Sequence, residues 1–148
     1  MNKRTLLPLA LLAADDEQPI EGRTRLQKLL FLAQKHLEEQ GEEPENSYEF
    51  VAYDYGPFSK EIYDDVDELE HRGLIEETPK EMDDGVIAYD FKLTEKGHQF
   101  IEENSLAESE VLEALEKQKQ EYWDTELQEL IDDVYTEYPE YAEESVLY

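Results

Sequence analysis

The sequence that decides the fold begins with residues 23–40, RTRLQKLLFLAQKHLEEQ. Its apolar residues recur with the spacing of one face of an α-helix, at Leu26, Leu29, Leu30, Ala33 and Leu37. Two more apolar residues, Phe31 and Leu32, widen this stripe, so we predict that the segment is the central core helix. Its cations are expected to face water: Arg25, Lys28 and Lys35.

The residues that follow predict a strand, a second helix and a hairpin. Residues 48–53 form a short aromatic strand that Gly56-Pro57 stops, and Ser59 is a natural N-cap for a helix that ends near Gly73. Two strands then flank a polar loop from Thr78 to Gly85, and the second strand leads into Leu93-Thr94-Glu95-Lys96-Gly97.

This order of elements is that of a winged-helix domain. We therefore predict an α+β, mainly helical fold, with a winged-helix-like domain and small β-hairpin wing over residues 1–104. Residues 105–148 are predicted to form a C-terminal helical arm packed on this domain or on a second subunit, starting at a Ser105/Glu108 capping box. Candidate interface residues of the arm are Leu127, Leu130, Ile131, Val134, Tyr135 and Tyr138.

The charge is unusual, because forty acids against thirteen bases give a net charge of −27. Salt at molar concentration shortens the Debye length to about 3 Å and makes such a surface tolerable. We therefore expect a cytoplasmic protein of a salt-loving organism. The apolar run from Leu6 to Ala14 is too short for a membrane span and is predicted to be a first core helix, not a signal peptide.

Few residues suggest catalysis or metal binding. The chain has no cysteine, and its three histidines belong to no metal or nucleophile motif. Pairs of neighbouring carboxylates arise by chance in so acidic a chain. We predict no enzyme activity, no catalytic residue, no metal ligand and no cofactor.

Two groups of residues are candidates for binding a partner. Residues 1–36 carry six bases against four acids, so a basic patch is predicted there, and its central members are Arg23, Arg25, Lys28 and Lys35. Aromatic residues cluster about the Gly56-Pro57 turn and are favoured in interfaces, namely Tyr53, Tyr55, Phe58 and Tyr63. Pairing of the bases with nearby carboxylates and burial of the rings in the core are the structural alternatives.

Several short motifs resemble a known family. They are Gly22-Arg23 with residues 26–33, then Tyr55-Gly56-Pro57-Phe58-Ser59, then Leu69 with Gly73-Leu74-Ile75. Their order over residues 5–100 resembles the YwgA-like proteins and the related Panacea domain of SocA-like antitoxins. The resemblance implies a non-enzymatic regulatory protein that holds another protein. It also implies that most motif residues fix the fold, with Gln27 and Lys28 as the polar exceptions.

The predicted function is therefore a protein-binding module of antitoxin or adaptor type, whose partner is a toxin or client and which forms a homodimer if the arm pairs. A DNA-binding winged-helix regulator, using the basic patch, is the alternative. Residues 59–85 carry eleven acids against three bases, which disfavours a recognition helix and wing on DNA. A DNA-mimicking inhibitor is a third alternative, and acids spread over every segment after His36 disfavour it.

Overall fold

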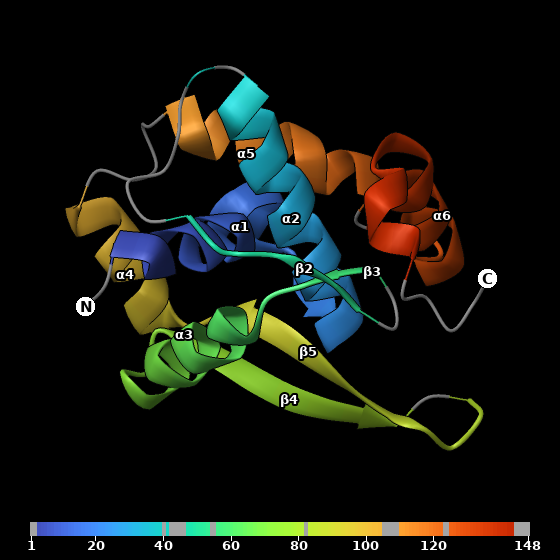
Figure 1. The fold of residues 1–148 in the computed structure, drawn as a ribbon. Helices are drawn as coiled ribbons and strands as arrows, with labels where there is room; N and C mark the ends of the chain where they lie inside the picture. The colour runs from blue at the N-terminus through green and yellow to red at the C-terminus, as the bar shows by residue number, and fades with distance from the viewer. Residues whose placement is uncertain are drawn as a thin grey trace.

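The computed structural model describes residues 3–39, 41, 47–53, 56–81, 83–104, 110–122 and 125–143. Helices predominate, and the strands form two small antiparallel sheets, so the predicted α+β, mainly helical class is confirmed. The elements, in chain order (Figure 1), are η1 (Lys3–Thr5), α1 (Leu6–Glu17), β1 (Ile20–Glu21), α2 (Arg23–Glu39), β2 (Val51–Tyr53), β3 (Gly56–Phe58), α3 (Lys60–His71), β4 (Ile75–Glu81), β5 (Ile87–Leu93), α4 (Glu95–Glu103), α5 (Glu110–Tyr122), α6 (Leu127–Glu137) and η3 (Pro139–Ala142).

Helix α2 is the centre of the core. The predicted helix is confirmed up to Glu39, and Gln40 lies outside the described residues. All five residues predicted to face the core are buried, and α1, α5, α6, β1 and β3 pack around the helix. Because α2 is covered on so many sides, the prediction that Lys28 faces water is wrong: this residue is only 3% exposed. Arg25 and Lys35 are half-buried.

The larger sheet has the strand order β1-β5-β4 and contains the predicted hairpin. The hairpin register runs from Ile75 opposite Leu93 to Glu81 opposite Ile87. The predicted loop from Thr78 to Gly85 is therefore too long, because Thr78 to Glu81 belong to β4. Pro79 misled the prediction, since proline is tolerated in an edge strand and β4 is one of the two edge strands of this sheet.

The smaller sheet differs more from the prediction. The strand predicted from Tyr48 covers only Val51–Tyr53, and the Gly56-Pro57 turn that was expected to stop it belongs to β3. Val51 lies opposite Phe58, and Tyr53 opposite Gly56. Tyr48 is instead held by the Gln34 side chain, which donates to the Tyr48 carbonyl at 2.9 Å and accepts from its N–H at 2.8 Å.

Helix α3 ends as predicted at a left-handed glycine. Gly73 has a φ of 76°, its N–H donates to the Glu70 carbonyl, and the Leu74 N–H donates to the Leu69 carbonyl. These two bonds form the Schellman motif and satisfy carbonyls at the helix end. Chain reversal here places Leu74 against the start of α4, where the Thr94 N–H donates to the Leu74 carbonyl at 3.1 Å.

A buried carboxylate ties the N-terminus to α3. Asp65 is 3% exposed and accepts two bonds from the Arg4 guanidinium, at 2.7 and 3.0 Å. The Tyr48 hydroxyl donates to the same carboxylate at 2.7 Å, and Arg4 also pairs with Glu61. A buried carboxylate needs such charge-assisted partners to offset its desolvation. The Arg4 guanidinium is therefore bound by carboxylates of α3 within the same chain.

The C-terminal residues form two helices, with α5 packed on α1 and α2 and α6 packed on α2 and β3. Lys119 of α5 is fully buried, and its Nζ donates to the carbonyls of Leu11 and Ala14 at 2.9 and 2.8 Å. It thus caps the end of the regular part of α1, before residues 15–17 adopt left-handed φ values of 54°, 53° and 59°.

The division at residue 104 remains a prediction, and the Ser105/Glu108 capping box lies outside the described residues. Within the part of the chain that the structure describes, no helix has the length and apolar character that crossing a membrane requires.

Candidate functional site

Two neighbouring side chains of α2 hold the segment that joins β3 to α3. The Gln27 amide donates to the Ser59 carbonyl at 2.9 Å and accepts from the Ser59 N–H at 3.0 Å. Lys28 Nζ donates to the Pro57 carbonyl at 2.9 Å. Ser59 occupies the predicted N-cap position of α3, but its hydroxyl makes no cap bond, and the Gln27 amide holds its backbone instead. Helix α2 therefore fixes the position of β3.

Gly56 lies where α2 and α6 approach each other across β3. It has a φ of 102°, and a Cβ at this position would lie 3.2 Å both from Lys28 Cε and from Tyr135 Cε1. Glycine is thus favoured by backbone conformation and by space. The close approach places the end of the Lys28 side chain directly behind the β3 backbone.

The burial of Lys28 changes its protonation. Burial lowers the pKa of Lys28 from its ordinary value of 10.5 to about 8, and no neighbouring charge contributes to this shift. Burial also lowers the pKa of Lys119 to about 8. Lys119 differs from Lys28 in having carboxylates nearby, since Asp15, Glu17 and Glu116 raise its pKa and so oppose the effect of burial. Lys28 is therefore a buried cation without a carboxylate partner among the groups that affect its pKa.

This environment predicts a specific pH dependence of stability. Between about pH 8 and 10.5 the unfolded chain holds more protons at Lys28 than the folded chain does. The free energy of unfolding of the wild type should therefore rise with pH in this window relative to Lys28→Met, by up to about 1.4 kcal/mol per pH unit. Urea unfolding of both proteins at several pH values measures the difference, and a difference independent of pH contradicts the prediction.

Five side chains from five elements form a connected surface that we call the aromatic seam: Tyr53, Phe58, Tyr63, Arg23 and Tyr89. Tyr53 stacks on Phe58 with ring centroids 5.0 Å apart, and Phe58 meets Tyr63 edge-on at 5.6 Å. The Arg23 guanidinium lies 5.6 Å from the Tyr63 ring centroid and 4.9 Å from that of Tyr89. The seam thus runs from β2 across α3 and α2 to the hairpin.

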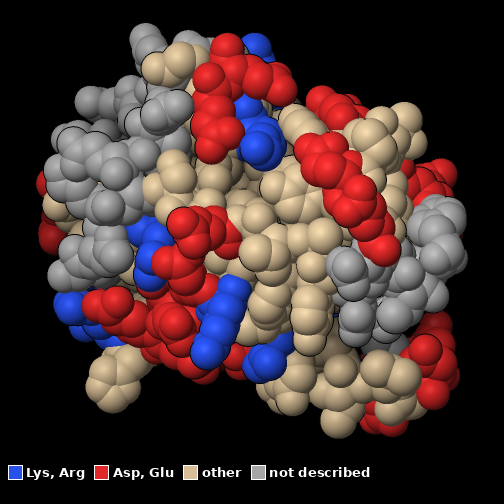
Figure 2. Space-filling model, in the orientation of Figure 1, with Lys and Arg blue, Asp and Glu red and all other residues tan. Residues whose placement is uncertain are grey.

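Much of the seam and its margin is exposed. Tyr53 is 53% exposed, and the apolar residues Val51 and Ile87 at the two ends are both 57% exposed. Figure 2 shows an uncharged area in the middle of this face, in the region of β2 and β3 and on towards the hairpin, with acidic residues on both sides. An exposed apolar area bordered by polar residues is typical of an interaction site.

A pocket of about 200 Å³ opens within this surface. The described residues that line it come from α2, β2, β3 and α3, and none of these carries a carboxylate: Thr24, Gln27, Lys28, Tyr53, Gly56, Phe58 and Tyr63. The rings of Tyr53, Phe58 and Tyr63 therefore form walls of the pocket, and Lys28 gives the pocket a positive charge.

The predicted partner-binding residues are only partly brought together. Arg23, Gln27, Lys28, Tyr53 and Phe58 lie at the seam or under it. Two others make contacts elsewhere: Arg25 donates to the Tyr122 carbonyl at 3.0 Å, and Lys35 lies 3.6 Å from Glu38. Tyr55 lies outside the described residues.

The predicted arm interface is mostly buried within the chain itself. Four of its residues are at most 8% exposed: Leu130, Ile131, Val134 and Tyr135. Tyr138 packs edge-on against Phe31 with ring centroids 5.0 Å apart. Leu127 is 38% exposed and is the member of the set that faces solvent most. These side chains therefore contribute to the core of one chain.

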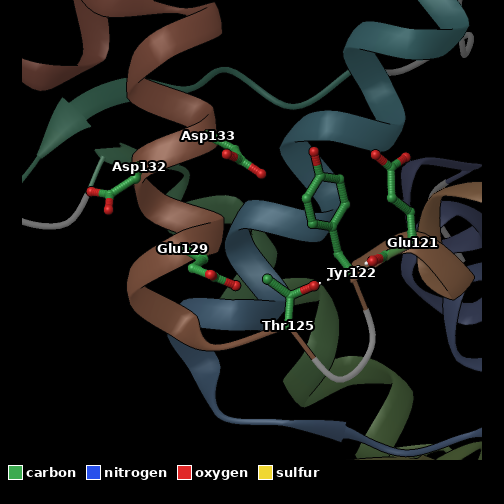
Figure 3. A pocket seen from close by; sticks show the side chains of 6 residues that line it. All are labelled: Glu121, Tyr122, Thr125, Glu129, Asp132 and Asp133. Carbon is green, nitrogen blue, oxygen red and sulfur yellow. Dashed lines mark hydrogen bonds between the residues drawn. The ribbon is translucent and has the colours of Figure 1, made fainter.

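A second, acidic pocket of about 430 Å³ lies between the end of α5 and α6 (Figure 3). The carboxylates of Glu129 and Asp133 come from α6, and Glu121 and Tyr122 come from α5. Among the described residues, no group of three histidine, aspartate or glutamate side chains has an arrangement that could hold a metal ion. Glu121, Glu129 and Asp133 are exposed, so these carboxylates form a solvated acidic surface.

Sequence reasoning missed one member of the candidate surface, Tyr89, and the lowered pKa of another, Lys28. Tyr89 was assigned only to a strand, and its contact with Arg23 depends on the pairing of β1 with β5. The lowered pKa of Lys28 was missed because the lysine was expected to be exposed. A helix with apolar residues around most of its circumference is usually buried, so Phe31 and Leu32 beside the main stripe were the available signal.

Comparison with known proteins identifies the family. The family described as "Antitoxin SocA-like, Panacea domain" matches residues 26–144, so this chain belongs to that family. A relative, the uncharacterized protein YwgA of Bacillus subtilis (strain 168), is 34% identical over 91 residues, which cover 62% of this chain and 51% of the relative. The chain thus spans about half the length of that relative. No solved structure shows a significant match.

Proposed function

We propose that this chain is a non-enzymatic regulatory module of antitoxin type that binds a protein partner, a toxin or a client, through the aromatic seam. One observation carries the proposal: in a chain with forty acids, an exposed surface is built from four rings and one arginine. Aromatic residues and arginine are enriched at the centres of protein interfaces, whereas aspartate and glutamate are depleted there. Membership of the antitoxin-like family supports a protein as the partner.

We further propose that residues 1–104 form a winged-helix-like domain. The order α1-β1-α2-α3-β4-β5, with β1 beside β5 in the sheet, supports it. The β4–β5 hairpin is then the wing, and the seam runs from the wing to β2. Residues 105–148 are the arm, whose α5 and α6 pack on this domain.

The same features disfavour DNA as the partner. Helix α3, which in a DNA-binding winged helix enters the major groove, carries six acids against one lysine. The predicted basic patch is also dispersed, because Lys28 is buried, Arg23 pairs with Glu77 at 2.7 Å and Lys35 lies beside Glu38. Cations already paired within the chain gain less from phosphate contacts.

The acidic surface is proposed to be an adaptation to a salt-rich cytoplasm. Lowering the salt concentration from molar to ~10 mM lengthens the Debye length from ~3 Å to ~30 Å and exposes the mutual repulsion of the carboxylates. The melting temperature should therefore fall markedly in ~10 mM salt. Differential scanning calorimetry at several potassium chloride concentrations measures this, and an unchanged melting temperature excludes the adaptation.

Affinity capture from an extract of the source cells in molar potassium chloride tests the proposed function. The wild type should retain a protein partner with and without nuclease treatment, and the purified partner should bind in a calorimetric titration. Tyr53→Ala should weaken this binding by tenfold or more, since buried aromatic anchors at interfaces contribute about 2 kcal/mol or more each. Tyr53 is exposed in the free protein, so its removal should leave the fold intact.

Leu127→Ala is the matched control, because Leu127 is also an exposed apolar residue but lies on α6. It should leave the affinity unchanged. If partner binding is lost with Leu127→Ala and retained with Tyr53→Ala, the interface lies on the arm and not on the seam. Capture that disappears on nuclease treatment instead supports a nucleic-acid partner.

A further inference from the structure

The pocket within the aromatic seam differs in charge from the other pockets of the described residues. The acidic pocket beside α6 is lined by four carboxylates, and the pocket that contains Arg25 is lined by Glu21, Asp90 and Glu126. The described residues that line the seam pocket include no carboxylate, and one of them is a lysine. An anionic group of a partner is therefore repelled over most of this protein and is accepted here.

We propose that this pocket receives an acidic side chain of the protein partner, whose carboxylate pairs with the Lys28 amine while its aliphatic part packs on the rings of Tyr53, Phe58 and Tyr63. This inference rests on the proposed function, because it names the chemistry of the group that the seam receives. The partner group is a glutamate or aspartate side chain.

The bonding of Lys28 leaves capacity for such a group. A charged lysine amine has three N–H donors. Among the described residues, the Lys28 amine makes one hydrogen bond, to the Pro57 carbonyl. No carboxylate is among the causes of its pKa shift. A cation held in a poorly solvated site without a counter-charge gains more from an incoming carboxylate than an exposed, already paired cation does.

Arg23, the cation of the seam itself, is a weaker candidate than Lys28 for binding the carboxylate of a partner. Arg23 lies against Tyr63 and Tyr89, and its guanidinium already donates to Glu77 at 3.0 and 2.7 Å. Its side chain is also 50% exposed, so salt screens it more strongly than it screens Lys28. In molar salt the buried amine is therefore the cation that retains its attraction for an anion.

The size and walls of the pocket limit the occupant. Its volume of about 200 Å³ lies below the ~300–1,000 Å³ typical of sites for small-molecule ligands. That space suits a single side chain. The ring walls exclude water from the inserted group, which strengthens an ion pair formed inside.

Selection of displayed random peptides on the full-length chain in molar potassium chloride tests the inference. Peptides that bind the seam are recognised by their loss of affinity for Tyr53→Ala and Tyr63→Ala. These peptides should share one acidic residue. Its replacement by glutamine should weaken binding to the wild type by about tenfold or more, and binding to Lys28→Met by less than about twofold, since the ion pair is absent there.

Each outcome decides one of the two proposals. Seam-binding peptides without a common acid, or an acid whose removal weakens binding equally to the wild type and to Lys28→Met, overturn the acidic anchor and leave the seam as the interface. Enriched peptides that are insensitive to both tyrosine variants, or the absence of enriched peptides, overturn the seam as the interface and the acidic anchor with it.

A measurement on the wild type alone covers the case in which Lys28→Met does not fold. Burial lowers the pKa of Lys28 to about 8, so its charge is lost as the pH rises above that value. The affinity of an acidic peptide should therefore fall between pH 7 and 9.5, whereas that of its glutamine counterpart should not. Among the described residues, the other titratable groups around Lys28 are Tyr53 and Tyr63, which line the same pocket, and Tyr135 beyond Gly56. Burial raises the pKa of Tyr63. Equal pH profiles for the two peptides overturn the ion pair.

Discussion

Gly97→Ala is expected to lower the free energy of unfolding by about 3 kcal/mol, the upper end of what overpacking usually costs. A Cβ at position 97 would overlap the carbonyl oxygen of Leu74 and lie 2.7 Å from Leu93 Cδ1. The Leu74 oxygen is not free to move away, because it accepts a hydrogen bond from the Thr94 N–H at 3.1 Å. Relief of the overlap therefore requires α4 to shift away from the chain reversal after α3.

The expected loss of stability is opposite in sign to the usual effect of replacing glycine by alanine in a helix. Gly97 lies within α4, and glycine to alanine in an ordinary helix interior stabilises by about 1 kcal/mol. Gln99→Ala in the same helix is the control, because Gln99 is exposed and the substitution should change the free energy of unfolding by less than about 0.5 kcal/mol. Urea unfolding measures both variants, and a Gly97→Ala protein as stable as the wild type rules out the packing of α4 on Leu74.

Lys119→Met is expected to lower the free energy of unfolding by about 3 kcal/mol, because it removes a charged donor from several buried carbonyls. Lys119 Nζ lies 2.9, 3.3 and 2.8 Å from the carbonyl oxygens of Leu11, Leu12 and Ala14. Methionine fills a similar volume but donates no hydrogen bond, so these oxygens at the end of the regular part of α1 lose their partner.

Lys117→Met provides the matched control. It changes the net charge by the same amount and lies on the same helix, but Lys117 is exposed. Its effect should remain below about 0.5 kcal/mol. Equal stability of the two variants in chemical denaturation would mean that the arm does not depend on the contact between α5 and α1.

Periodicity made the central parts of the fold predictable. The apolar spacing of residues 26–37 identified α2, and the turn-forming residues of the loop between two strands identified the β4–β5 hairpin. Strand β1 was not predicted, because two residues carry no periodicity and their pairing with β5 depends on the tertiary structure. Strand β3 was not predicted because Gly56-Pro57 is a turn signal when the chain is considered locally.

The buried lysines were unpredictable for a different reason. Lys28 and Lys119 are 3% and 0% exposed, although lysine is almost never fully buried in proteins. Each amine reaches backbone carbonyls that belong to another element, the Pro57 carbonyl for Lys28 and carbonyls at the end of α1 for Lys119. Such partners are distant in sequence. They are also backbone groups, which every residue has, so no sequence motif indicates them.

The candidate site was predictable in part. The clustering of Tyr53, Phe58 and Tyr63 near one turn correctly indicated a group of neighbouring rings. The contribution of Tyr89 and the separation of Arg25 and Lys35 from the rings follow from helix packing and strand pairing. The basic patch was predicted from charge along the sequence, and the side-chain partners of those bases disperse it.

The most direct test of the central claim, that a protein partner binds the aromatic seam, is the hydrogen–deuterium exchange footprint of the complex in molar potassium chloride. We predict slower exchange on partner binding in β2, in β3 and at residues 87–89 of β5, with no change in α6. Protection confined to α6 and the acidic pocket, with β2 and β3 exchanging as in the free protein, would contradict the claim.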